Sequence, residues 1–362
     1  MKLIRSEEML LALLRAVLHQ REVEIGYFQQ VTVDDWVQCY RLAVRQGVSA
    51  LAWEGIERLP LEDAPPLDVK LSWALLEKKQ LATYRKHCQA VNELTQLFTQ
   101  HGIATVVLKG VGLSRLYPVP AHREGGDIDI YTYSADQSRM TDEEANRLAD
   151  WLMEQQGIEV SRSEKGKDSH FLFHDILIEN HRFFFDTLRF PVAADVEQWL
   201  EASISSQLVK LLDGECPINV PTIAFDQVYV SVHAALHTGI GLSLRHLCDW
   251  AVLLQQKESW SLNDKDFPYP AVVFTQLCNQ YLGTHVPIKG GEELMAELMQ
   301  EILRPAYQVK IPFKNPVLSG IYKARRTLHC LAFMRRLLKP TLREMVLPLL
   351  RLMITQPNRL IR

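Results

Sequence analysis

Two aspartates separated by a single residue, Asp127 and Asp129, are the residues in this sequence best suited to chemistry. They stand at the start of an alternating segment, residues 128–133, whose pattern is typical of a β-strand. Because neighbouring side chains point to opposite faces of a strand, both carboxylates are expected on one face. Like charges repel unless a cation lies between them, and Mg²⁺ or Mn²⁺ prefers carboxylate oxygens. The spacing therefore predicts a divalent metal site.

A second apolar segment, residues 176–181, offers a third carboxylate, because Glu179 and His181 lie on one of its faces. If this strand pairs beside the aspartate strand, three carboxylates converge as two-metal phosphoryl or nucleotidyl transfer requires. His181 either takes a direct part or orients a carboxylate. Asp175 and Asp186 are nearby alternatives to Glu179 as the third ligand.

A glycine turn, Lys109-Gly110-Val111-Gly112, follows a short β-branched segment at residues 104–108 and precedes a short helix. Such a turn offers backbone N–H groups and a helix N-terminus to nucleotide phosphates. Lys109 would add a point charge, and Arg123 a forked contact to phosphate or carboxylate. Both cations could instead be structural ion-pair partners of the acids.

The run from residue 108 to 131, LKGVGLSRLYPVPAHREGGDIDIY, resembles the signature of an uncharacterised bacterial nucleotidyltransferase family within the DNA polymerase beta superfamily. The shared features are a Leu-Lys-Gly turn, a Tyr-Pro that ends the short helix, an arginine, and then Gly-Asp-x-Asp. An acid-x-His strand follows, here residues 179–181. The resemblance covers residues 100–185 closely. It extends to residues 242–250, which resemble a helical leucine-arginine and aspartate element after the catalytic domain.

The resemblance implies an enzyme that moves an NMP from an NTP to a hydroxyl acceptor and releases pyrophosphate. It implies Asp127, Asp129 and Glu179 as metal ligands, with Gly110 in the phosphate turn. Two features depart from the wider superfamily: Val111 follows Gly110 in place of Ser or Gly, and Gly110 is farther from Asp127 than in many members. The acceptor is a small molecule, a sugar, RNA or a protein. A toxin-like enzyme that modifies tRNA or protein, or a non-catalytic nucleotide-binding scaffold, is the alternative.

The surrounding pattern predicts an α+β fold, with a small mixed sheet as the nucleotidyltransferase core between helical N-terminal and C-terminal regions. The expected division is 1–100, 101–222 and 223–362. Further strands are expected at 158–160, 170–173, 176–180 and 218–220, and His174-Asp175 is a tight connection. Helices are expected after Ser6, at 33–46, 67–100, 111–117, 141–156, 195–203, 225–236 and 244–255. Thr141 is the expected N-cap of its helix, with Glu144 at the capping-box position.

Two residue pairs in the C-terminal helices have helical i, i+4 spacing. His233 and His237 share a helical face, as two metal ligands would. The sequence shows no third ligand for them, so a packed or hydrogen-bonded pair is the better interpretation. Arg245 and Asp249 either form an intrahelical ion pair, or Arg245 contributes to the nucleotide pocket.

Charge is distributed unevenly along the chain. Residues 303–362 hold 13 Lys or Arg and one acid, leaving 27 basic and 42 acidic residues before them. This basic end suggests an anionic partner such as RNA or lipid, a solvated helix face, or an internal electrostatic contact. Its central cations are Lys323, Arg325, Arg326, Arg335, Arg336, Lys339 and Arg343. The apolar run at 345–354 is too short to span a membrane.

The six cysteines show no CxxC pair and no regular spacing, which argues against a zinc knuckle and a disulfide framework. Most are expected to be small buried hydrophobes. The first residues make a poor signal peptide because Glu7 and Glu8 interrupt them. A cytoplasmic, reducing setting is the simplest prediction.

Overall fold

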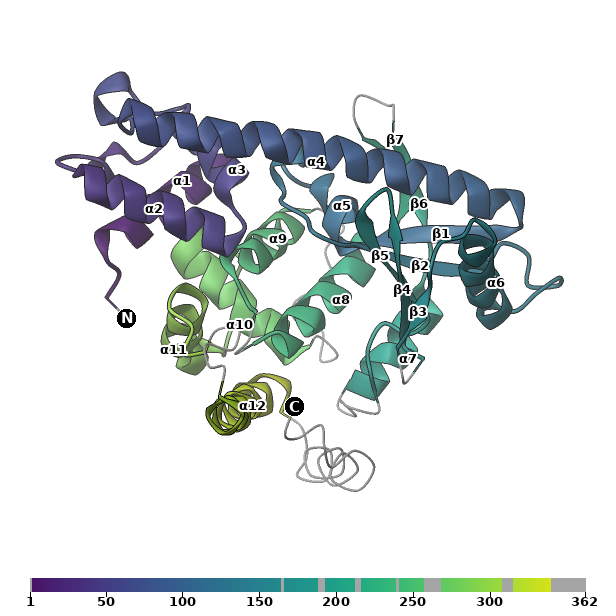
Figure 1. Ribbon diagram of the computed structural model, residues 1–362. Helices are drawn as coiled ribbons and strands as arrows, with labels where there is room; N and C mark the ends of the chain where they lie inside the picture. Colours follow the sequence, from purple (N-terminus) through teal and green to yellow (C-terminus); the bar gives the residue numbers. More distant parts are fainter. Residues whose placement is uncertain are drawn as a thin grey trace. The chain divides into compact units, whose positions relative to one another are not determined.

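The computed structural model shows two compact units, each described here by itself (Figure 1). The sheet unit comprises Leu3–Phe184 and Ser203–Asp226, and the helical unit comprises Met1–Lys2, Phe185–Ala202 and Gln227–Arg362. The residues that the structure describes are 2–163, 166–187, 193–211, 216–238, 241–256, 268–307 and 315–339. Arg343 and the apolar run at 345–354 lie outside them.

The main sheet has five strands in the order β1-β2-β5-β4-β3. Strands β2 and β5 are parallel, and every other neighbouring pair is antiparallel. This mixed sheet among helices confirms the predicted α+β class. The strands are β1 (Ile103–Leu108), β2 (Ile128–Ser134), β3 (Ser161–Arg162), β4 (Asp168–Phe173) and β5 (Ile176–His181). A separate hairpin pairs β6 (Gln207–Leu211) with β7 (Cys216–Val220).

One face of the main sheet forms the apolar core of the sheet unit. Alternate residues of β1, β2, β4 and β5 point into it, among them Val107, Ile130 and Ile178, which are almost fully buried. Helices α4 (Leu67–Gln100) and α6 (Asp142–Gln155) pack on this face. Because strand side chains alternate, the residues between these apolar ones point to the opposite face. That opposite face carries the candidate site.

The N-terminal helices belong to the same unit as the sheet. They are α1 (Arg5–Leu18), α2 (Val33–Gln46) and α3 (Ser49–Ile56), with single turns η1 (Ile25–Tyr27) and η2 (Leu61–Asp63). The long helix α4 contacts both α3 and β1, so it extends from these helices to the sheet (Figure 1). Two short helical segments, α5 (Lys109–Ser114) and η3 (Pro120–His122), separate β1 from β2.

The structure confirms some of the local predictions and contradicts others. Thr141 caps α6 with Glu144 in a capping box, and His174-Asp175 forms the β4–β5 turn with positive φ at both residues, as predicted. The predicted Ser6 cap is wrong: Ile4 is the N-cap of α1, and the Glu7 carboxylate accepts its N–H at 3.0 Å. The strand expected at 158–160 is also wrong. Its apolar residues pack against the core without joining the sheet, and β3 lies just after them.

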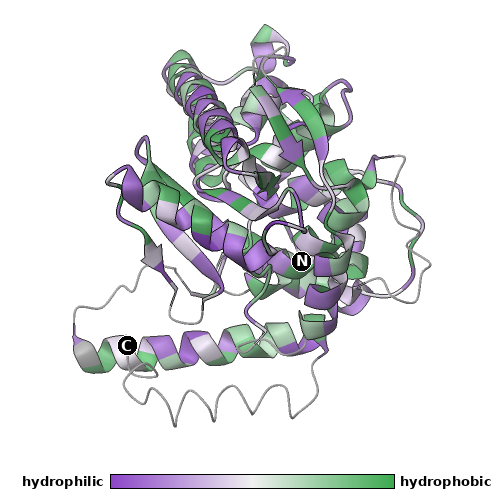
Figure 2. Cartoon of the chain, turned by 90° about the vertical axis from the view of Figure 1, so that its right-hand side faces the viewer, coloured by the Kyte–Doolittle hydropathy of each residue, from purple (hydrophilic) through white to green (hydrophobic). Residues whose placement is uncertain are grey.

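The helical unit is built from α-helices and one π-helical turn. Their bounds are α7 (Ala194–Ser203), α8 (Ile223–Leu236), α9 (Leu244–Leu254), α10 (Tyr269–Leu277), η6 (Cys278–Leu282), α11 (Glu292–Leu303) and α12 (Pro316–Leu338). Hydrophilic and hydrophobic residues are mixed along α12 (Figure 2). Two cations of the basic end make contacts inside this unit: Arg336 pairs with Glu297, and the Lys339 ammonium lies 3.5 Å from the Tyr269 ring centroid. An internal electrostatic contact, one of the alternatives for the basic end, is therefore present at these two residues.

All six cysteines are buried free thiols, as the sequence predicted. Within the described ranges, none of the helices has both the length and the apolar character needed to cross a bilayer.

Candidate metal and nucleotide site

Strand register brings two of the three predicted carboxylates, Asp129 and Glu179, together on the polar face of the main sheet. In the parallel β2–β5 pair, Asp129 lies opposite Glu179 and Tyr131 lies opposite His181. Asp129, Glu179 and His181 each offer one ligand atom, and these atoms lie within 4.8 Å of one another. Among the described residues, this is the one group of three acids, histidines or cysteines that could hold a metal ion.

Asp129 is the buried centre of this group, with 1% of its surface exposed. The Lys109 ammonium lies 3.0 Å from its Oδ1, and Nε2 of His181 lies 2.9 Å from the same oxygen. Burial alone would raise the pKa of Asp129. The positive charge of Lys109 and the His181 hydrogen bond outweigh burial and hold the pKa well below its usual value. Asp129 is therefore a permanent anion that attracts cations.

Glu179 has the opposite electrostatic character. Burial raises its pKa, and the negative charges of Asp129 and Asp127 raise it further. Its carboxylate oxygens lie 3.7 Å from a nitrogen of His181 and 3.7 Å from a nitrogen of His170. A divalent cation between Asp129 and Glu179 would relieve their repulsion, so the donor set fits a divalent metal ion.

Asp127 lies immediately before β2 and outside the group of three. Its charge contributes to the raised pKa of Glu179. Asp127 also acts on His87 of α4, whose pKa is lowered by burial and by Arg123 although Asp127 opposes the shift. Because Asp127 precedes the strand, the sheet ladder does not fix its position.

The glycine turn follows β1 directly and has an unusual backbone. Lys109 has φ +27°, and Gly110 has φ +49° with ψ −125°, a conformation that L side chains rarely adopt. A Cβ on Gly110 would lie 3.9 Å from Nη1 of Arg123. A Cβ on Gly112 would lie only 2.6 Å from the Val107 carbonyl oxygen. The turn thus requires both glycines, and it places Lys109 beside Asp129.

Two polar residues of β4 join this face although the sequence pattern did not identify them. His170 lies opposite Glu179, and Asp168 lies opposite His181 in the antiparallel β4–β5 pair. Nε2 of His170 is 3.1 Å from Asp168, whose pKa is lowered because Lys167 and His181 outweigh its burial. The predicted strand began at 170. Extending its alternation by two residues would have placed Asp168 on the same face.

Other predicted residues lie elsewhere. Asp175 is in the β4–β5 turn, at the opposite end of β5 from Glu179. The rings of His233 in α8 and His237, which follows the end of α8, have centroids 4.5 Å apart, and the His246 ring of α9 lies 5.9 Å from that of His237. Arg245 is half-buried on α9 in the helical unit, so its part in the nucleotide pocket stays a prediction.

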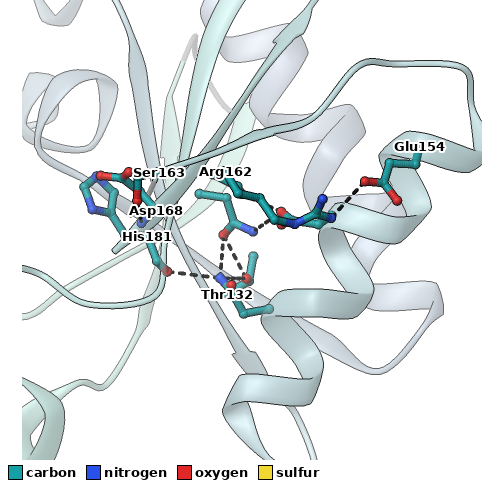
Figure 3. A network of polar contacts seen from close by, with 10 residues as sticks. Thr132, Glu154, Arg162, Ser163, Asp168 and His181 are labelled. Atoms are coloured by element: carbon teal, nitrogen blue, oxygen red, sulfur yellow. Dashed lines mark hydrogen bonds and ion pairs between the residues drawn. The ribbon is translucent and has the colours of Figure 1, made fainter. Parts of the chain in front are cut away.

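A buried hydrogen-bond network on the other face of the sheet holds the strands in register (Figure 3). Asn146 of α6 donates to Thr132 Oγ1 at 3.0 Å, to Asn180 Oδ1 at 3.1 Å and to the His181 carbonyl at 3.1 Å. Asp150 of α6 accepts from Ser169 at 2.5 Å and from Asn180 at 3.1 Å, and it pairs with Arg162 at 3.3 Å. The network thus joins β2, β4 and β5 behind the carboxylates.

We expect Asn146→Ala to lower the free energy of unfolding by about 3 kcal/mol, because it leaves buried acceptors on two strands without their donor. Urea unfolding would measure the change. Asn92→Ala on α4 is the matched control, since Asn92 makes an exposed hydrogen bond to Gln96. An equal loss in both variants would contradict a special role for the network.

A glycine turn, paired aspartates and a facing acidic strand on a mixed sheet together describe the class of nucleotidyltransferases. The comparison with protein families agrees: the chain belongs to a family of uncharacterised nucleotidyltransferases, whose model matches residues 32–266. This range includes the glycine turn, the three carboxylates and Arg245. No curated protein and no solved structure matches the chain.

Proposed function

We propose that this protein transfers an NMP from an NTP to a hydroxyl acceptor and releases pyrophosphate, with Mg²⁺ or Mn²⁺ as cofactor. The observation that carries the proposal is the convergence of Asp129, Glu179 and His181 beside the Lys109 ammonium. Asp127, Asp129 and Glu179 would hold the cation. When bound, it would supply the positive charge that polarises the NTP phosphates.

Residues of the chain itself bind the phosphates, receive the proton and orient the metal ligands. Gly110 and Gly112 allow the backbone of the turn to approach the phosphates, and Lys109 and Arg123 neutralise their charge. Glu179 would help to receive the proton of the acceptor hydroxyl, because a carboxylate beside the reacting group can act as a general base. As that proton leaves, the acceptor oxygen bonds to the α-phosphorus and the bond to pyrophosphate breaks. His181 is hydrogen-bonded to Asp129 and orients the Asp129 carboxylate.

The first experiment is isothermal titration of the full chain with each NTP, in the presence and absence of Mg²⁺. We expect binding that requires the metal and favours one base. A pyrophosphate-release assay with hydroxyl acceptors of each class would then test transfer. Absence of NTP binding with any metal would contradict the proposal. Binding without pyrophosphate release from any acceptor would favour a nucleotide-binding scaffold.

A further inference from the structure

The loop between α5 and β2 carries Arg123 and leads into Asp127. We call residues 120–126 the aspartate loop. Its last two residues before Asp127 are Gly125 and Gly126. Because glycine has the widest conformational freedom, these two residues cannot by themselves place the Asp127 carboxylate. Ile128 of β2 holds the chain after Asp127, so the direction of Asp127 depends also on where the loop before the two glycines is held.

Glu124 attaches this loop to the beginning of α3. Its Oε1 accepts hydrogen bonds from the Ser49 N–H at 2.5 Å, the Ser49 hydroxyl at 2.6 Å and the Ala50 N–H at 3.1 Å. These N–H groups lie in the first turn of α3, where they have no partner within the helix. A carboxylate at a helix N-terminus is also stabilised by the helix dipole. Glu124 therefore supplies α3 with the cap that the Val48 side chain does not provide.

Helices α3 and α4 hold the loop at further points. Nε2 of Gln80 donates to the Ala121 carbonyl at 3.2 Å and to the Arg123 carbonyl at 3.3 Å. The His122 ring lies 3.2 Å from Glu54 and 3.6 Å from Glu77. Glu124 is the last of these attachments before the two glycines. Among these contacts Glu124 is the nearest to Asp127 on the loop side, while Ile128 of β2 holds the chain on the other side of Asp127.

We propose that Glu124 is a positioning residue, which fixes the aspartate loop on α3 so that Asp127 faces Asp129 and Glu179. This inference rests on the proposed function, because it concerns the same metal site. Glu124 acts through the loop, because its Oε1 accepts from three donors on α3. The N-terminal helices thereby become part of the active site, although they contribute no ligand to it.

The test is a titration of the full chain with Mn²⁺. Electron paramagnetic resonance measures the concentration of free Mn²⁺ at each point. We expect Glu124→Ala to weaken Mn²⁺ binding about tenfold, the size typical for residues that orient metal ligands. Glu124→Gln should stay within about threefold of the wild type, because its amide oxygen can still accept from the same N–H groups. Ser49→Ala removes only the hydroxyl donor and should have a small effect. Rescue by glutamine would distinguish positioning from metal ligation.

Asp35→Ala is the matched control. Asp35 caps α2 by accepting from the Thr32 N–H at 3.0 Å, so its loss also removes a helix-capping carboxylate. Mn²⁺ affinity should be unchanged in this variant. Equal Mn²⁺ affinity of wild type, Glu124→Ala and Asp35→Ala would overturn the inference. If wild type and Asp129→Asn bind Mn²⁺ equally, the proposed metal site itself is wrong. The two failures are therefore distinguishable.

Discussion

Replacing Asp129 with asparagine is expected to reduce nucleotidyl transfer by about 10³-fold, because the proposed metal site would lose its central anionic ligand. Each tenfold loss corresponds to about 1.4 kcal/mol, so the change amounts to roughly 4 kcal/mol of transition-state stabilisation. Asp129 is buried, and its low pKa keeps it charged throughout the physiological range. Pyrophosphate release at saturating NTP and Mg²⁺ would measure the loss. Undiminished transfer would show that this strand does not carry the metal.

The same substitution should also affect stability, because it leaves the Lys109 ammonium without its charged partner at 3.0 Å. Removing one member of a buried ion pair typically costs about 3–5 kcal/mol. Lys109 retains 18% side-chain exposure, so we expect the lower end of that range. The double variant Lys109→Met/Asp129→Asn removes both charges and should recover most of the stability. It should not recover transfer, and this separates the catalytic loss from unfolding.

Asp127→Asn provides a second comparison within the same motif. Asp127 is more exposed than Asp129 and lies before the strand. Its replacement should abolish metal-dependent transfer as well, with little change in the free energy of unfolding. If only Asp129→Asn destabilises the fold while both abolish transfer, the two aspartates share a ligand role and differ in burial alone.

Much of this site could be predicted because its parts are local in sequence. The alternation around Asp127 and Asp129, the apolar strand that ends at Glu179 and the glycine turn each follow from a few neighbouring residues. Their convergence required only that β2 and β5 be neighbours, and the structure shows the two strands paired in parallel. The capping box of α6 follows from Thr141 and Glu144 in the same way.

The remaining features depend on contacts between distant residues. Glu124 reaches Ser49, 75 residues earlier in the chain, and no local pattern identifies that partner. Helix α3 escaped prediction because it is buried on nearly every side, so its sequence has no amphipathic period. The apolar residues at 158 and 160 resemble a strand but pack on the core without a ladder partner. The pattern of apolar residues alone does not distinguish a paired strand from an unpaired segment that packs on the core.

The second large effect is expected at Gly112. A Cβ there would lie 2.6 Å from the Val107 carbonyl oxygen, which belongs to the backbone of β1 and cannot rotate away. Gly112→Ala must therefore shift the glycine turn relative to the strand. Overpacking of this kind costs about 1–3 kcal/mol of stability. A displacement near 1 Å can cost about 10²-fold in rate at a reactive site, so transfer should fall by that order and NTP binding should weaken.

Titration with NTP and Mg²⁺, together with urea unfolding, would separate the two effects of this change. Gly26→Ala is the matched control, since a Cβ at Gly26 would meet nothing within 4 Å. That variant should keep both stability and NTP affinity. If Gly112→Ala loses stability but binds NTP as the wild type does, the turn supports β1 without contacting phosphate. If stability and NTP affinity fall together, the glycine is required because the backbone itself approaches the nucleotide. Val111 in place of Ser or Gly is then compatible with phosphate binding, because main-chain N–H groups would bind the phosphates.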